Sequence, residues 1–201
     1  MSAAELCFAS AALSARVLRA DEVPALQALY DANPEYALIV NGRRPGPNEA
    51  QADFDERPPP QLSYRQQWQF GLFDAAEALV GVAIVTADLC AVGVWHIALF
   101  LLATRLHGQG LATPIYAALE DWAKTQGARW LRLGVVRGNG RAEQFWQRLG
   151  YREVRVREGV DTGGRINTLR VMVKALPAAG LAELEIYLRL VPRDRPGAES
   201  P

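Results

Sequence analysis

The chain has 201 residues, half of them hydrophobic and 22% charged, which is the composition of an ordinary globular protein with a full core. Its formal net charge is zero, which argues against nucleic acid or an anionic membrane as partners. The lone Cys7 and Cys90 favour neither a disulfide scaffold nor a metal site, and no apolar run is long enough to span a bilayer. We therefore expect a cytoplasmic protein without a metal.

The first third of the chain predicts few regular elements. Residues 1–14 are rich in alanine and serine, and we expect them to form a flexible leader. An alternating strand at 16–19 precedes a helix at 21–31, which Asn33 and the following proline end. One further short helix is expected at 48–56, before three consecutive prolines.

The remainder alternates between strand and helix patterns. Apolar and alternating runs predict strands at 66–73, 79–86, 92–102, 129–136, 151–158 and 168–175. Helical spacing predicts helices at 108–126 and 139–149. We expect a folded domain over 15–176 and a C-terminal extension over 177–201, with an edge strand at 184–190 and a disordered end from 192 onward.

The segment Arg105–Ala112 reads RLHGQGLA and joins an apolar run to a helix. Glycines let the backbone approach a ligand, and the first helical N–H groups point at it, so this turn suits an anion. The segment lacks a Walker signature, and Thr113 stands where a dinucleotide fingerprint needs glycine or alanine. It predicts a phosphate or pyrophosphate site, with an ordinary turn as the alternative.

A second segment, Asn139–Tyr151, follows the apolar run 130–136. Asn139 suits a helix N-cap, and Gly150 suits the residue that ends a helix. Four apolar side chains fall on one helical face: Ala142, Phe145, Trp146 and Leu149.

Together the two segments resemble the Arg-x-x-Gly-x-Gly and Asn-x-x-Ala-x-x-Phe-Tyr-x-x-x-Gly-Phe motifs of the GCN5-related N-acetyltransferase (GNAT) superfamily, over about residues 94–175. The resemblance implies an α/β fold with a mixed, mostly antiparallel twisted sheet of about seven strands and helices on both faces. It also implies that strands 92–102 and 129–136 are parallel and splay apart, with the acyl-CoA arm in the gap.

By the same resemblance, acetyl-CoA is the co-substrate and no metal takes part. The backbone of the glycine turn would hold the pyrophosphate, and Asn139 would contact the pantetheine arm or an ordered water as well as cap its helix. The residues expected to contact acetyl-CoA are Leu99, Phe100, Leu101, Arg105, Leu106, His107, Gly108, Gln109, Gly110, Leu111, Ala112, Asn139, Ala142, Phe145 and Trp146.

Trp146 departs from the family pattern, in which this position is often a tyrosine that can protonate the leaving thiolate. An indole N–H is only a donor and cannot serve as a general acid. The thiol would then leave as its anion or take a proton from water. Tyr151 falls on the family's phenylalanine position and is expected in the core.

His96 is the candidate general base, because the ordinary pKa of histidine suits proton removal from an amine near neutral pH. In strict alternation His96 shares a sheet face with Ala98 and Phe100. The alternative is a structural histidine packed between strands. Further candidates on the acceptor side are Tyr36, Asp53, Asp74 and Glu77. Trp68 and Trp95 could line an acceptor pocket, with a place in the core as the alternative.

Charge is uneven along the chain. Residues 31–60 carry six acidic residues against three arginines, which favours a cationic acceptor, whereas 137–174 carry nine basic residues against four acidic ones, which suits a phosphate-bearing ligand. Both regions could equally be solvated surface. We predict an N-acetyltransferase that moves an acetyl group from acetyl-CoA to a primary amine of a small molecule or peptide in a ternary complex, as a monomer or homodimer. The alternative is a non-catalytic acyl-CoA-binding module.

Overall fold

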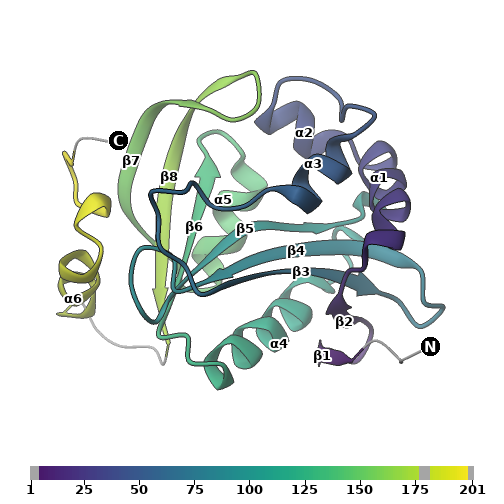
Figure 1. The fold of residues 1–201 in the computed structure, drawn as a ribbon, viewed down its shortest axis with the longest axis horizontal. Coiled ribbons are helices and arrows are strands. Elements are labelled where there is room, and N and C mark those ends of the chain that lie inside the picture. Colours follow the sequence, from purple (N-terminus) through teal and green to yellow (C-terminus); the bar gives the residue numbers. More distant parts are fainter. Residues whose placement is uncertain (1–4, 177–181, 199–201) are drawn as a thin grey trace.

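The computed structural model describes residues 5–176 and 182–198, and a single sheet forms its centre (Figure 1). Within the described residues this sheet has eight strands in the order β1-β2-β3-β4-β5-β6-β8-β7. Every neighbouring pair is antiparallel except β5 and β6. The strands are β1 Leu6–Ala9, β2 Ser14–Val17, β3 Gln66–Phe73, β4 Leu79–Ala87, β5 Val94–Leu102, β6 Trp130–Val136, β7 Arg152–Asp161 and β8 Ile166–Ala175. The mixed, mostly antiparallel α/β fold is confirmed.

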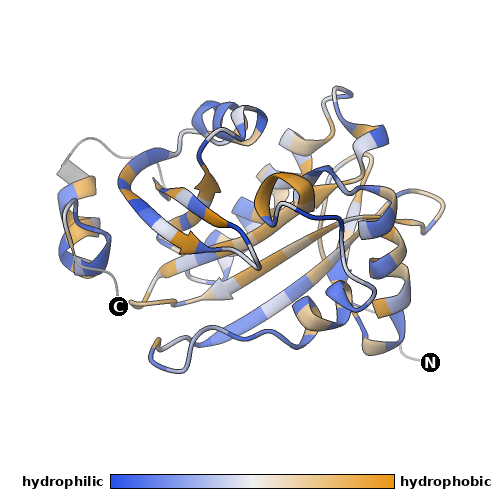
Figure 2. Cartoon of the chain, turned by 90° about the horizontal axis from the view of Figure 1, so that it is seen from above, coloured by the Kyte–Doolittle hydropathy of each residue, from blue (hydrophilic) through white to orange (hydrophobic). Residues whose placement is uncertain are grey.

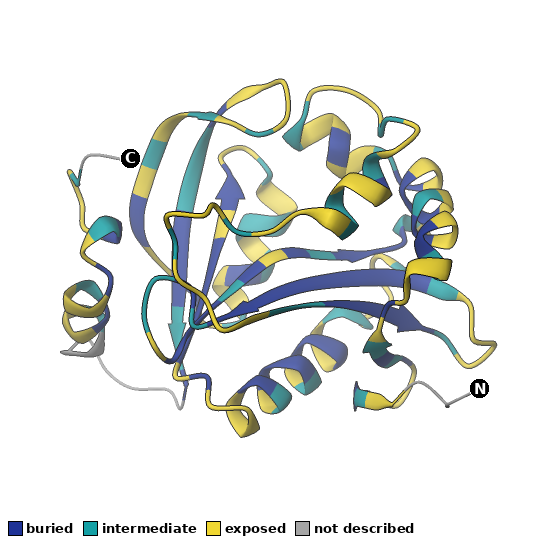
Figure 3. Ribbon diagram, viewed as in Figure 1, coloured by how far each residue is buried: buried dark blue, intermediate teal, exposed yellow. Residues whose placement is uncertain are grey.

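Helices cover both faces of the sheet (Figure 1). The helices are α1 Val23–Ala32, α2 Glu35–Val40, α3 Glu49–Asp55, α4 Ala112–Thr125, α5 Gly140–Arg148 and α6 Ala182–Leu190, with 3-10 turns η1 Ala20–Glu22, η2 Thr104–Leu106 and η3 Pro192–Asp194. The first core lies under α4 and α5, with Tyr116 and Trp146 as large members. The second lies under α1 and α3, with Leu26 and Ala50. Hydrophobic residues concentrate along the central strands (Figure 2), which are almost wholly buried (Figure 3).

The helix α4 connects the one parallel pair of strands, as such a crossover requires. Ile115, Leu119 and Ala123 recur at four-residue intervals and are buried, which fixes its inner face. Gly127 ends the helix region at a φ of 99°, a conformation that glycine adopts without strain.

The strand β5 changes neighbours halfway along its length. It pairs with β6 only over Val94–Ile97, and beyond these residues it pairs, within the described sheet, with β4 alone. Ala98 is an extra residue in the β4–β5 register, a β-bulge that reverses which side chains face which layer. Leu99 therefore packs with the α1 and α3 core, whereas Phe100 packs with the α4 and α5 core. The expectation that His96 and Phe100 share a face is thus wrong.

The N-terminal segment is not a loose leader where it is described. Leu6–Ala9 forms β1, which pairs with β2 in a hairpin closed by Ser10 and Leu13. Phe8 anchors it, because its ring is 6% exposed and lies 5.1 Å from the ring of Phe70. The sequence did not predict this strand, because Phe8 is surrounded by small residues such as alanine and serine. Residues 1–4 of the expected leader lie outside the described residues.

The pattern Asn33-Pro34 predicts only the end of a helix, whereas the structure has a second helix, α2, directly after it. Pro34 instead stands at the N-cap of α2, where its missing N–H costs nothing.

The expected edge strand over 184–190 is also wrong, because these residues lie in α6. Leu184, Tyr187 and Leu188 fit helical spacing as well as alternation, and they pack, with Val191, against β6 and β8. Within the segment that we expected to be disordered, Pro192–Asp194 forms η3, and the structure describes the chain as far as residue 198. Residues 199–201 lie outside the described residues.

The turn η3 buries Asp194 completely. Its carboxylate accepts hydrogen bonds from Arg132 Nε at 2.7 Å and Arg132 Nη2 at 2.8 Å, and from the Tyr187 hydroxyl at 2.5 Å. Burial alone would raise the pKa of Asp194, but these donors lower it. The C-terminal segment is thus tied to β6 through a paired buried charge.

We expect Asp194→Ala to lower the free energy of unfolding by about 3–5 kcal/mol, because the Arg132 guanidinium would stay buried without its partner. Urea denaturation followed by circular dichroism measures this change. The matched control is Glu185→Ala, an exposed acidic residue on α6, which should change stability by less than about 0.5 kcal/mol. Equal stabilities of the two variants would contradict the role of the pair.

Candidate functional site

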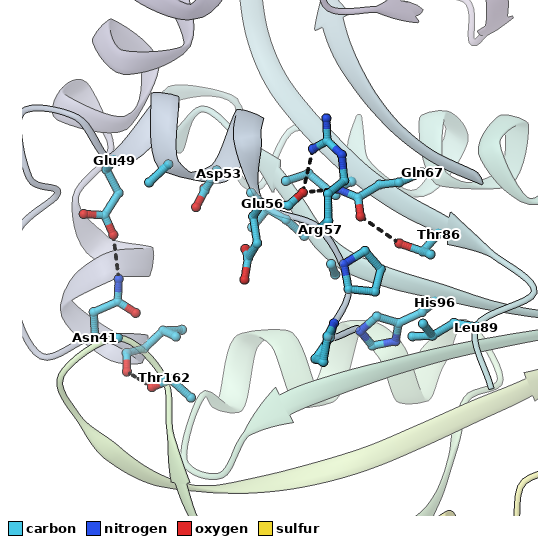
Figure 4. A pocket seen from close by; sticks show the side chains of 18 of the residues that line it. Asn41, Glu49, Asp53, Glu56, Arg57, Gln67, Thr86, Leu89, His96 and Thr162 are labelled. Atoms are coloured by element: carbon cyan, nitrogen blue, oxygen red, sulfur yellow. Dashed lines mark hydrogen bonds between the residues drawn. The ribbon is translucent and has the colours of Figure 1, made fainter. Parts of the chain in front are cut away.

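A cavity of about 990 Å³ opens on the α1–α3 side of the sheet (Figure 4). Its walls come from α1, α2, α3, the strands β3 to β7, the β7–β8 turn and the C-terminal segment. Ala98 and Leu99 line it, so the cavity reaches the point where β5 leaves β6. The volume is at the upper end of that of small-molecule sites in proteins.

One wall of the cavity is acidic. Glu49, Asp53 and Glu56 lie on or beside α3 and face the cavity (Figure 4). Asp53 Oδ2 accepts a hydrogen bond from the Tyr30 hydroxyl at 2.7 Å. Burial raises the pKa of Asp53, and the negative charges of Glu56 and Glu49 raise it further. The hydrogen bond from Tyr30 opposes these effects, and the pKa of Asp53 is about 6. Gln69 fixes the end of α3 by donating to the Asp53 carbonyl at 2.7 Å.

His96 lies across the cavity from α3 (Figure 4). Its Nδ1 lies 3.3 Å from Arg132 Nη1, and because arginine only donates, Nδ1 accepts. A neutral imidazole then carries its proton on Nε2 and has no free lone pair for a substrate proton. Burial first, and then the charge of Arg132, lower the pKa of His96 to about 3. This arrangement favours a hydrogen-bond donor more than a base.

The glycine turn lies where β5 meets α4. Gly108 and Gly110 have φ values of 77° and 75°, and no described heavy atom lies within 4 Å of the place where a Cβ would stand on either. No described side chain caps the first amides of α4, whose N-cap is Leu111. The predicted helix start at 108 is therefore four residues early, because the glycines form an exposed turn before Ala112.

His107 connects this turn to α5. Its Nε2 hydrogen-bonds the Leu102 carbonyl at 2.9 Å, so the ring proton lies there and Nδ1 accepts from Arg141 Nη1 at 2.5 Å. Arg141 thereby joins Arg105 as a second cation beside the turn. Arg141 lies inside the second motif, but the sequence assigned it no role.

The second motif forms α5 as expected. Asn139 caps it by accepting a hydrogen bond from the Ala142 amide at 3.3 Å. Phe145 and Trp146 pack against Phe100 from the other side of the β5–β6 gap. Tyr151 is buried as expected. The two motifs therefore meet at the carboxyl ends of the parallel pair, one following each strand.

The phenols and indoles beside the β5–β6 gap belong to the core, whereas Tyr30 and the exposed Tyr36 line the cavity. The hydroxyls of Tyr116 and Tyr151 lie 2.9 Å apart, and burial raises the pKa of both. Trp68 and Trp95 stack on the α4 side and do not line the cavity. At the position where the family often has a tyrosine, Trp146 packs in the core against Phe100 and supplies no phenol that could titrate.

Among the described residues, no helix has the length and apolarity that a bilayer crossing requires. The same part of the chain contains no group of three or more metal-ligating side chains.

The chain matches the model of the "Acetyltransferase (GNAT) family" over residues 27–151. No curated protein matches it by sequence. It is similar to a solved acetyltransferase from Thermus thermophilus, with 22% identity, coverage of 81% of this chain and 96% of that chain, and a TM-score of 0.62. A spermidine N-acetyltransferase from Vibrio cholerae, solved with CoA and spermine, has 16% identity, coverage of 81% and 95%, and a TM-score of 0.63. A GCN5-related N-acetyltransferase from Kribbella flavida has 21% identity, coverage of 81% and 97%, and a TM-score of 0.59.

We expect His96 to stay neutral, with its proton on Nε2, from about pH 5 to pH 8, because its pKa is lowered to about 3. Nitrogen-15 NMR of the imidazole rings measures both the charge and the tautomer. The chain has only two histidines, so a His107→Gln variant assigns the signals. A titration midpoint near the ordinary histidine pKa would contradict the arrangement with Arg132.

Proposed function

Since the chain belongs to the acetyltransferase (GNAT) family, we propose that it transfers an acetyl group from acetyl-CoA to a primary amine by direct attack in a ternary complex. The observation that carries this proposal is the parting of β5 and β6 beyond Ile97 and Leu133. Strands that part leave backbone N–H and C=O groups for a ligand, and here the glycine turn adjoins the gap on one side and the cavity on the other.

The residues present suit acetyl-CoA, which supplies an acetyl thioester when bound. We propose that the turn Arg105–Ala112 holds the pyrophosphate through uncapped amides, with Arg141 adding positive charge. The free edge of β5 from Leu99 to Leu101 would hydrogen-bond the pantetheine arm, with Asn139 and Phe145 closing the gap from α5. Two glycines with open space above them support this assignment, because a phosphate needs close approach to the backbone.

The acceptor amine would enter through the cavity, where the acidic wall favours its ammonium form. We propose that Asp53 removes the proton, because a pKa of about 6 makes its carboxylate a competent base near neutral pH. The nitrogen then forms a bond to the acetyl carbon, the carbon–sulfur bond breaks, and sulfur leaves as a thiolate. The second proton that the nitrogen loses on becoming an amide passes to this thiolate or to water. Tyr30 orients Asp53 in this scheme.

The base role of His96 stays a prediction, and Asp53 has the better support. We propose that His96 instead donates its Nε2–H into the cavity. The expected cytoplasmic location and the monomeric or dimeric state also stay predictions. Acetyl-CoA binding without turnover on any amine would favour the non-catalytic alternative.

Replacing both Gly108 and Gly110 by valine should weaken acetyl-CoA binding by about tenfold or more, because the side chains would fill the space that a phosphate needs. Calorimetric titration with acetyl-CoA measures this, with NAD as the unrelated ligand. Gly127→Val is the matched control, since Gly127 also has positive φ and open space but lies at the far end of α4. Unchanged affinity in the folded double variant would defeat the assignment of the turn.

We expect Asp53→Asn to lower kcat about 100-fold or more, because the amide cannot take a proton. In the unchanged protein, kcat/KM should fall as the pH drops below about 6, where the carboxylate becomes protonated. The asparagine variant should be at least as stable as the unchanged protein at alkaline pH, because a raised pKa means that the ionised form destabilises the fold.

The control for this variant is Asp31→Asn, an exposed aspartate on α1 outside the cavity, which should keep full activity. Thiol release with an amine panel measures the rates. An Asp53→Asn variant with unchanged kcat would assign the base elsewhere, and His96→Gln would then be the next variant to measure.

A further inference from the structure

The cavity wall opposite α3 carries arginines. Arg132 on β6, Arg157 on β7 and Arg193 in η3 all line it. Arg132 is neutralised by Asp194. In the described part of the chain, neither Arg157 nor Arg193 forms an ion pair, and the nearest recorded polar contact of the Arg193 side chain is Cys90 Sγ at 3.9 Å. The cavity therefore has a mainly acidic wall, where Arg57 is the one lining arginine beside α3 among the described residues, and a basic wall.

Arg157 is the least satisfied of these cations. Its Nε is buried and has no hydrogen-bond partner among the described residues. Burial and repulsion from Arg132, Arg193 and Arg155 lower the pKa of Arg157. The charge of Asp194 offsets part of this repulsion, but its carboxylate already accepts three hydrogen bonds, from Arg132 and Tyr187, and forms none with Arg157. An unpaired guanidinium with a buried Nε is costly, so an anion at this position would be strongly favoured.

Asp161 is the other carboxylate on this side of the cavity, and it is occupied within its own turn. Its Oδ1 accepts hydrogen bonds from the amides of Gly163 at 3.0 Å and Gly164 at 2.9 Å. The β7–β8 turn is held in turn against α2, because Thr162 Oγ1 donates to the Val40 carbonyl at 2.6 Å. These contacts fix the shape of the wall and engage one oxygen of the Asp161 carboxylate.

Resting on the proposed function, we propose that the acceptor is a primary amine that also carries a carboxylate, which Arg157 binds with help from Arg193. The ammonium group faces Asp53 and Glu56, and the carboxylate faces the arginines across the cavity. Guanidinium groups bind carboxylates through two parallel hydrogen bonds, so this wall selects an anionic group by geometry as well as by charge. The class of substrate is thus a zwitterion whose ammonium and carboxylate groups are several atoms apart, such as an amino acid acetylated on its side-chain amine, rather than a simple polyamine.

The test measures acetyl transfer from acetyl-CoA, by thiol release, to the L-amino acids, to the matching α-carboxamides, and to diamines and polyamines without a carboxylate. The best amino acid should exceed its carboxamide in kcat/KM by about 10- to 100-fold, the value of a hydrogen-bonded charge pair. Arg157→Gln should remove this preference by lowering kcat/KM for the acid alone. Its affinity for acetyl-CoA should not change, which separates an acceptor site from a site for the phosphates of CoA.

Arg152→Gln is the matched control, because Arg152 lies on the same strand but is exposed and does not line the cavity. It should keep the preference for the acid. Equal losses on acid and carboxamide in Arg157→Gln would assign Arg157 a structural role and overturn the inference. Turnover of polyamines without turnover of amino acids would overturn it while the proposed function stands. Acetyl-CoA binding without turnover of any amine would overturn both.

Discussion

The structure depends on one irregularity in β5. The extra residue at Ala98 reverses the faces of the strand, and β6 departs immediately after the last paired residue, Ile97. Leu99 can therefore hold the α1 and α3 layer while Phe100, the next residue, packs under α5. A regular strand would keep β5 and β6 paired and close the sheet. The bulge thus creates both the gap that the two motifs border and the access from the cavity to that gap.

Local patterns in the sequence predicted the parts of the fold that local physics decides. The alternating pattern predicted the bounds of β3. The Asn139 cap predicted the start of α5, and the glycines predicted the turn before α4. The bulge at Ala98 could not be predicted, because it depends on which layer each neighbouring side chain joins. The helix α6 was missed for a related reason, since its apolar residues fit both periods and only packing on β6 and β8 decides between them.

On the acceptor side, the sequence named His96, Tyr36 and Asp53, which line the cavity, but it did not indicate the basic wall. The sequence predicted residues for the cofactor side in more detail. That side is built from contiguous segments, which a sequence displays directly. The acceptor side joins residues far apart in the chain, such as Asp53 on α3 and Arg132 on β6. The unequal charge of residues 31–60 indicated an acidic wall, but the basic wall opposite it needs β7 and the C-terminal segment in place. The contact between Asp194 and Arg132 could not be predicted from any sequence motif, because the two residues are far apart in the chain.

Two aspartates, Asp194 fully buried and Asp53 half-buried, show how the fold places carboxylates in contrasting environments. Asp194 meets a bidentate guanidinium and a phenol, and despite burial its pKa falls, so its charge is permanent and serves to anchor the C-terminal segment. Asp53 meets one phenol and two neighbouring carboxylates, and its pKa rises to about 6, within reach of physiological proton exchange. Groups whose environments push their pKa values apart in this way are those to which different roles can be assigned. Because Arg132 balances Asp194 and also occupies the lone pair of His96, the anchor of the C-terminal segment disfavours proton removal by the histidine, which is why we propose Asp53 on α3 for that chemistry.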